Sequence, residues 1–109
     1  MSSEACLVFF GVRYEPSESE LEALEMRRHP LMIAARKAGL RHYWANFGFG
    51  EEKYYVFVGA QIGIIGAEIV AEVGIPSEAF RTMIEETTAK LREANVPGTP
   101  MLWLQLLST

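Results

Sequence analysis

The sequence predicts an α+β domain, with a four-stranded antiparallel sheet and two helices on one face of it. Four segments rich in β-branched and aromatic residues indicate strands, and two segments with apolar residues at helical spacing indicate helices. They follow one another as strand, helix, strand, strand, helix, strand. The chain has 109 residues, half of them hydrophobic, so one domain (residues 1–109) with one core is expected.

The first strand is expected at Ala5–Tyr14. Both of its sides are largely apolar, so it should lie in the middle of the sheet. A helix should follow, because Ser17 and Glu20 have the spacing of a capping box. The apolar stripe of this helix consists of Leu21, Leu24, Leu31 and Ala35.

Pro30 interrupts this stripe. Proline removes a helical hydrogen-bond donor and disfavours helical geometry at the preceding residue, so a kink or a break is expected near His29. His29 is expected either to cap or hinge the helix locally or to point into a cleft. Gly39 should end the helix as a left-handed C-cap.

The second strand is expected at residues 40–49, followed by a glycine-rich turn and a third strand at Tyr54–Gly66, the longest run of β-branched and aromatic residues. Residues 67–74 should form an extended arm or a short edge strand. A second helix should begin with Ser77 as its N-cap, and the last strand is expected at Met101–Leu107. The buried stripe of the second helix is expected to contain Phe80, Met83, Ile84, Thr87, Leu91 and Ala94.

Helices can cover only one face of this sheet. The side chains expected beneath them are Val8, Phe10, Val12, Ala45, Phe47, Val56, Val58, Ile62, Leu102, Leu104 and Leu106. The other face should carry Leu7, Phe9, Gly11, Arg13, His42, Trp44, Asn46, Tyr55, Phe57, Gly59, Gln61, Trp103 and Gln105. So many aromatic side chains on an open face usually mark a contact surface or a ligand site.

The element order is that of the split βαβ, or ferredoxin-like, pattern, in which the first and third strands lie in the middle. The chain resembles the dimeric α/β-barrel members of the ferredoxin-like superfamily. That superfamily includes cofactor-free monooxygenases and small-ligand-binding proteins. The resemblance implies a site between the helices and the sheet or inside the barrel. The aromatic open face itself predicts a homodimer whose sheets face each other and enclose a cleft, with Gly11, Gly59 and Gly63 leaving room for a ligand or a second subunit.

The function expected first is therefore a small homodimeric domain that binds a small apolar or aromatic ligand, or a partner, on the helix-free face. The residues expected to line this site are Phe9, His42, Trp44, Tyr55, Phe57, Gln61, Trp103 and Gln105. The alternative is a cofactor-independent enzyme with His42 as general base and Asn46 or Arg13 steadying an oxyanion. A third interpretation is a purely structural subunit of a larger assembly. In structural roles of this kind, the aromatic residues would be cross-strand packing pairs and His42 a hydrogen-bonded interface histidine.

Composition argues against several other functions. A net charge of −4 disfavours nucleic acid, which is bound through many Lys and Arg contacts. The single cysteine, Cys6, is expected as a buried thiol, and the two histidines have no metal-site spacing, so neither a metal nor a cofactor is expected. Glutamates interrupt the longest apolar run, which disfavours a membrane span. Without a visible targeting signal, we expect a cytoplasmic protein.

Overall fold

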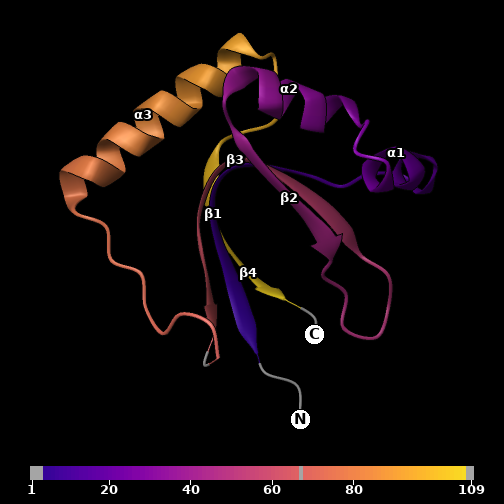
Figure 1. Cartoon of the computed structure of the whole chain (residues 1–109), viewed down its shortest axis with the longest axis horizontal. Helices are drawn as coiled ribbons and strands as arrows, with labels where there is room; N and C mark the ends of the chain where they lie inside the picture. Colours follow the sequence, from indigo (N-terminus) through magenta and orange to yellow (C-terminus); the bar gives the residue numbers. More distant parts are fainter. Residues whose placement is uncertain (1–3, 67, 108–109) are drawn as a thin grey trace.

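The computed structural model describes residues 4–66 and 68–107, and Ala67, the first residue of the predicted arm, lies outside these ranges. The elements along the chain are β1 (Ala5–Tyr14), a 3₁₀ turn η1 (Glu18–Glu20), α1 (Leu21–Glu25), α2 (Pro30–Ala38), β2 (Arg41–Asn46), β3 (Tyr54–Gly66), α3 (Ser77–Glu93) and β4 (Met101–Leu107) (Figure 1). Residues 68–76 contain no strand, so the alternative of a short edge strand is not seen in this part of the arm.

The four strands form one antiparallel sheet in the order β2-β3-β1-β4. The predicted α+β class, the antiparallel sheet and the central position of the first and third strands are thus confirmed. The main core lies between the sheet and the helices, where α1, α2 and α3 all contribute buried side chains. Its buried members are Val12, Leu24, Met32, Ala35, Leu40, Val56, Val58 and Leu91.

The first helical segment breaks rather than kinks. α1 ends at Glu25 and α2 begins at Pro30, which occupies the first helical position because its missing N–H has no intrahelical acceptor there. Gly39 ends α2 in the left-handed conformation (φ 73°), as expected. At the start of α3, the N-cap position belongs to Pro76 and Ser77 is already helical, so the predicted cap is one residue late.

A β-bulge changes the faces of the long strand β3. Val8 pairs with Gly63 and Phe9 with Gln61, so Ile62 is an extra residue in β3. One inserted residue exchanges the two faces beyond it. Gly63 therefore faces the helix side, where its Cβ position is 3.1 Å from Val73, and not the expected cleft.

The predicted burial of the β4 leucines is wrong. Leu102, Leu104 and Leu106 lie on the helix side of the sheet but are 47%, 69% and 54% exposed. The reason is the course of α3, which buries only Thr87 and Leu91, in its C-terminal half. In Figure 1 the N-terminal half of α3 stands away from the sheet and no helix covers the lower half of β1, β3 and β4.

Gly11 and Gly59 lie opposite each other on the two central strands. Their φ angles are 156° and 152°, and a Cβ atom on Gly11 would lie 2.1 Å from the carbonyl oxygen of Val58. Both glycines are buried. They are therefore explained by the close approach of two backbones, and not by space for a ligand.

Candidate functional site

The helix-free face of the sheet carries an aromatic core of its own. Phe9 and Phe57 are both 0% exposed, with ring centroids 5.5 Å apart. Phe47 and Trp103 pack edge-on against Phe57, at 5.6 and 6.0 Å. Edge-to-face and tilted pairs at these distances are favourable arrangements of rings. The expected floor of a ligand cleft is thus filled by its own side chains.

The polar groups of this face also have partners within the chain. The Cζ atom of Arg13 lies 4.0 Å from the ring centroid of Tyr55 and 4.2 Å from that of Trp103. Arg13 Nη1 donates a hydrogen bond to Gln105 Oε1 at 3.0 Å. Trp103 Nε1 donates to the Gly11 carbonyl at 3.0 Å. These contacts agree with the packing interpretation, because the polar and charged side chains of this face find hydrogen-bond and cation–π partners without a ligand.

The predicted faces of β2 are wrong. His42 and Trp44 lie opposite two buried valines of β3 that face the helices, so they are on the helix side. Ala45 and Phe47, expected beneath the helices, pack on the helix-free face instead. Both alternating sets of this strand mix polar and apolar residues, so periodicity alone cannot decide which set is buried.

The structure therefore divides the predicted site residues between two faces. Gln61 lies opposite Phe9 and is half-buried on the helix-free face, where Arg13 also lies, across the sheet from His42. Asn46 Oδ1 accepts hydrogen bonds from the backbone N–H groups of Gly48 and Lys53, at 3.0 and 2.9 Å, and so closes the hairpin turn. Neither Arg13 nor Asn46 is placed to steady an oxyanion beside His42.

A hollow of about 430 Å³ lies beside β2, an edge strand of the sheet, and it includes two predicted ligand residues. Its lining residues are Arg27, Met32, Arg36, His42, Tyr43 and Trp44. Met32 is buried, whereas both arginines are exposed. Arg36 Nη2 donates a hydrogen bond to the Arg27 carbonyl at 3.0 Å, which ties the helix break to α2. Among the described residues, no carboxylate lies within ion-pair distance of either arginine.

Charge and burial act together on His42. Burial lowers the pKa of its imidazole, and the positive charges of Arg36, Arg27 and Arg41 lower this pKa further. The hollow therefore combines an imidazole that favours its uncharged form with fixed positive charge on guanidinium groups. Such a site suits a negatively charged ligand better than a neutral or a positive one.

The two arginines of the hollow were not among the predicted site residues. A signal for them exists in the sequence, because residues 27–41 contain five of the ten Lys and Arg residues and no acidic residue. Which of these five side chains share a hollow depends on the geometry of the helix break, and composition does not give that geometry.

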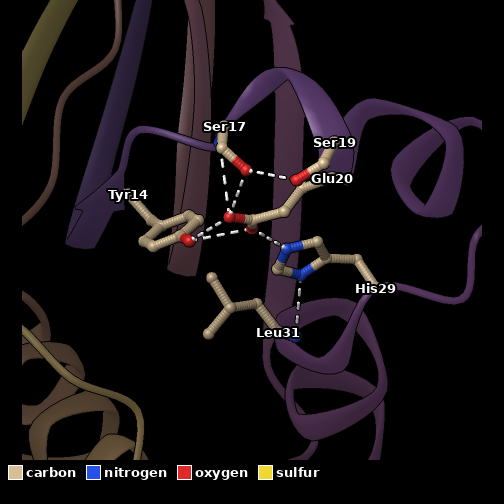
Figure 2. A network of polar contacts seen from close by, with 6 residues as sticks. All are labelled: Tyr14, Ser17, Ser19, Glu20, His29 and Leu31. Atoms are coloured by element: carbon tan, nitrogen blue, oxygen red, sulfur yellow. Dashed lines mark hydrogen bonds and ion pairs between the residues drawn. The ribbon is translucent and has the colours of Figure 1, made fainter.

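His29 belongs to a separate polar network around Glu20 (Figure 2). Its Nε2 lies 2.6 Å from Glu20 Oε2, and its Nδ1 accepts the backbone N–H of Leu31 at 3.1 Å. Because Nδ1 is an acceptor, Nε2 carries the hydrogen atom and donates a hydrogen bond to the Glu20 carboxylate. With both ring nitrogens engaged and the residue 5% exposed, His29 is the local cap of α2.

Glu20 accepts from several other groups in the same network. The Tyr14 hydroxyl lies 2.6 and 2.8 Å from its two oxygens, and Ser17 N–H donates at 3.3 Å, as in the predicted capping box. The hydrogen bonds from His29 and then Tyr14 lower the pKa of Glu20 to about 2, although burial opposes them. The hydrogen bond to Glu20, together with burial and the glutamate charge, raises the pKa of Tyr14. This network joins β1, η1 and α2.

Other kinds of site find little support in the described residues. No group of three or more His, Cys, Asp or Glu side chains there could hold a metal ion. None of the described helices is long and apolar enough to cross a membrane. Cys6, expected to be buried, is half-buried and its thiol contacts the Leu7 carbonyl at 3.6 Å. The arginine-lined hollow is therefore the best-supported candidate site.

Comparisons of the chain with protein-family models, with curated proteins and with solved structures give no significant match.

Proposed function

We propose that the chain is a small homodimeric, ligand-binding domain with a ferredoxin-like fold. The dimer we propose does not use the helix-free face, where the homodimer is expected from the sequence, because the aromatic side chains of that face already pack against one another. Two features support the fold assignment. The elements follow the split βαβ order. The strand order β2-β3-β1-β4, with the helix-bearing core on one face, has the first and third strands in the middle.

The observation that carries the dimer is the bare surface of β4. Leu102, Leu104 and Leu106 are exposed on one side of an edge strand, whose free backbone groups can pair with another strand. Across a two-fold axis, β4 of one copy would pair antiparallel with β4 of the other. Edge pairing would set the two leucine rows side by side on one face of a continuous sheet and bury part of them. Complete burial of their exposed parts, which exceed one and a half whole side chains, would contribute at most about 3–5 kcal/mol per protomer.

A neighbouring groove extends this surface. It has a volume of about 300 Å³ and is lined by Val8, Ile62, Ile65, Val73, Ile75, Phe80, Leu102 and Leu104. Stable interfaces bury roughly 800 Å² on each partner, which is more than three leucines supply. Edge pairing of β4 therefore has to be supplemented by contacts that the partner makes along this groove.

Light scattering after size exclusion tests the dimer. The wild-type chain should elute as a dimer at high micromolar concentration, and Leu104→Glu should be monomeric because it places a charge in the interface. Phe49→Glu is the matched control, since Phe49 is 66% exposed but lies in the β2–β3 hairpin, at the other edge of the sheet. A wild-type chain that is monomeric throughout this range would exclude the homodimer.

We place the small ligand in the hollow beside His42 and Trp44. These two predicted ligand residues line a hollow whose volume lies within the range typical of small-molecule sites. Their predicted companions Phe9 and Phe57 have no exposed surface to offer a ligand. Chemical-shift changes confined to the hollow on addition of a ligand would support this placement, and changes confined to the helix-free face would overturn it.

A cofactor-independent enzyme with His42 as general base remains the second candidate. Two observations favour it: His42 lines the hollow, and burial together with the neighbouring arginines lowers the pKa of its imidazole, which favours the unprotonated form that a general base needs. The test follows a bound ligand by NMR over hours in the presence of the wild-type chain and of His42→Gln. Conversion by the wild type alone would favour the enzyme, and an unchanged ligand in both samples would favour simple binding.

A further inference from the structure

We propose that the hollow beside β2 binds a small organic anion, namely a planar carboxylate attached to one aromatic ring. The carboxylate would lie on the guanidinium groups of Arg27 and Arg36, and the ring against Trp44. This inference rests on the proposed ligand-binding role of the hollow and is independent of the dimer.

The first argument is the uncompensated charge. Arg27 and Arg36 lie beside the same hollow, yet the described residues offer neither of them a carboxylate within ion-pair distance. The chain as a whole has fourteen acidic residues against ten basic ones. Glu20, an acid on the preceding turn, already accepts hydrogen bonds from His29 and Tyr14. Both arginines are exposed to solvent, so their charge is accessible to an anionic ligand.

The second argument is the backbone of Arg27. Its φ is 57°, in the left-handed region that glycine adopts most easily. Arg27 N–H bonds the Leu24 carbonyl at 3.1 Å, and Arg28 N–H bonds the Ala23 carbonyl at 2.8 Å, so Arg27 is the left-handed residue of a Schellman motif at the end of α1. Glycine would suit this position better. The presence of an arginine there is consistent with a role for its side chain, which lines the hollow.

The third argument is the chemistry of the walls. Two guanidinium groups can hold a carboxylate through paired N–H donors, and the hydrogen bond from Arg36 to the Arg27 carbonyl orients one of them before any ligand arrives. Met32 and Trp44 supply apolar and aromatic surface. His42, whose pKa is lowered by burial and by the neighbouring arginines, adds a polar ring to the wall. A flat ring bearing one carboxylate matches this combination.

Three probes separate the possible sources of binding: benzoate, its neutral isostere benzamide, and inorganic phosphate. Each is titrated into ¹⁵N-labelled protein at matched ionic strength, because salt screens exposed charges. Benzoate should shift the amide signals around Arg36 and Trp44, with an affinity at least tenfold higher than that of benzamide or phosphate. If benzamide binds as tightly as benzoate, the ligand need not be an anion. If phosphate binds as tightly, the ligand needs no aromatic ring. If benzoate does not bind at all, the proposal as a whole is refuted.

Two variants locate the anion. Arg36→Gln and Arg27→Gly should each weaken benzoate at least tenfold, whereas Arg81→Gln, which removes an exposed arginine from the distant half of α3, should leave the affinity unchanged. Arg27→Gly keeps the left-handed turn and should leave the melting temperature unchanged or raise it, so a loss of binding in this variant cannot come from unfolding. Undiminished affinity in both hollow variants would refute the site.

The outcomes also separate this inference from the proposed function. If benzamide binds the hollow as tightly as benzoate, the hollow is still a ligand site but the anion is wrong. If neither probe shifts signals at the hollow, the placement of the ligand site fails as well. The oligomeric state is measured on its own and does not enter either result.

Discussion

Glu20 is expected to contribute more to the stability of this fold than any of its exposed neighbours. Its carboxylate receives the Nε2–H of His29, the hydroxyl of Tyr14 and the N–H of Ser17. Glu20→Ala removes these contacts, together with the hydrogen bond that Glu20 accepts from the Ser17 hydroxyl at 3.0 Å. The His29 side chain is only 6% exposed, so leaving its Nε2–H without an acceptor costs about 1–3 kcal/mol of folding stability. Loss of the capping box adds about 1 kcal/mol.

The expected loss is therefore about 2–4 kcal/mol, a large share of the stability of a domain of this size. Such a loss lowers the melting temperature by roughly 10–20 °C. Urea denaturation followed by circular dichroism gives the free energy of unfolding directly. Glu22→Ala is the matched control, because Glu22 is exposed on the next turn, and it should change stability by no more than about 0.5 kcal/mol.

The same carboxylate should make stability depend on pH. The folded state lowers the pKa of Glu20 from 4.5 to about 2, so its contribution is complete above pH 4.5 and is lost as the pH falls toward 2. The full shift corresponds to roughly 3 kcal/mol. Because the side chain is 28% exposed, screening by solvent reduces this to about 1–2 kcal/mol.

Glu20→Gln isolates this effect, since the amide does not titrate but keeps one acceptor oxygen. Between pH 5 and pH 2.5, the wild-type chain should lose about 1–2 kcal/mol more than Glu20→Gln does. If the difference in unfolding free energy between the two proteins stays constant over this interval, the network around Glu20 does not have the strength that its geometry indicates. Equal stability of Glu20→Ala and Glu22→Ala at pH 7 would refute the reasoning in the same way.

Two further predictions concern the hollow and the central strands. Arg36→Gln should raise the pKa of His42 toward its ordinary value of 6.5, because a neighbouring positive charge is removed. NMR titration of the imidazole measures this pKa. An unchanged pKa would mean that Arg36 does not act on His42. Gly59→Ala should lose about 3 kcal/mol of stability, because its Cβ atom would lie 2.3 Å from the Phe10 carbonyl oxygen at a φ of 152°. In urea denaturation, Gly74→Ala is the control, since nothing lies within 4 Å of its Cβ position; equal midpoints for the two variants would contradict this reasoning.

Those parts of the fold that depend on local signals could be predicted from the sequence. The bounds of β1, β3 and β4 are as predicted, because alternating apolar residues fill these strands and Pro, Gly or polar residues flank them. The break before Pro30 and the C-cap at Gly39 follow from the backbone restrictions of those two residues. Each of these features is decided within a few positions of the chain.

The predictions that are wrong concern features that depend on which distant part of the chain packs against a residue. The extra residue Ile62 exchanges the two faces of β3 from Gly63 onward, and no local pattern marks it. Residues 40–47 have apolar side chains in both of their alternating sets, so periodicity predicts the wrong face for Trp44 and for Phe47. The leucines of β4 do share one face, as predicted, but periodicity does not reveal whether a helix covers that face.

The candidate site shows the same division between local and distant causes. The sequence gives the break at Pro30 and the basic segment around it, but the position of Arg27 depends on contacts at both ends of that break. The Schellman motif fixes it on the α1 side, and His29, held by Glu20, fixes the start of α2. The hydrogen bond from Arg36 to the Arg27 carbonyl then joins the two sides at the rim of the hollow. His29, the cap of α2, thus also helps to position the arginine charge at the hollow. This links the polar network around Glu20 in Figure 2 to the proposed anion site.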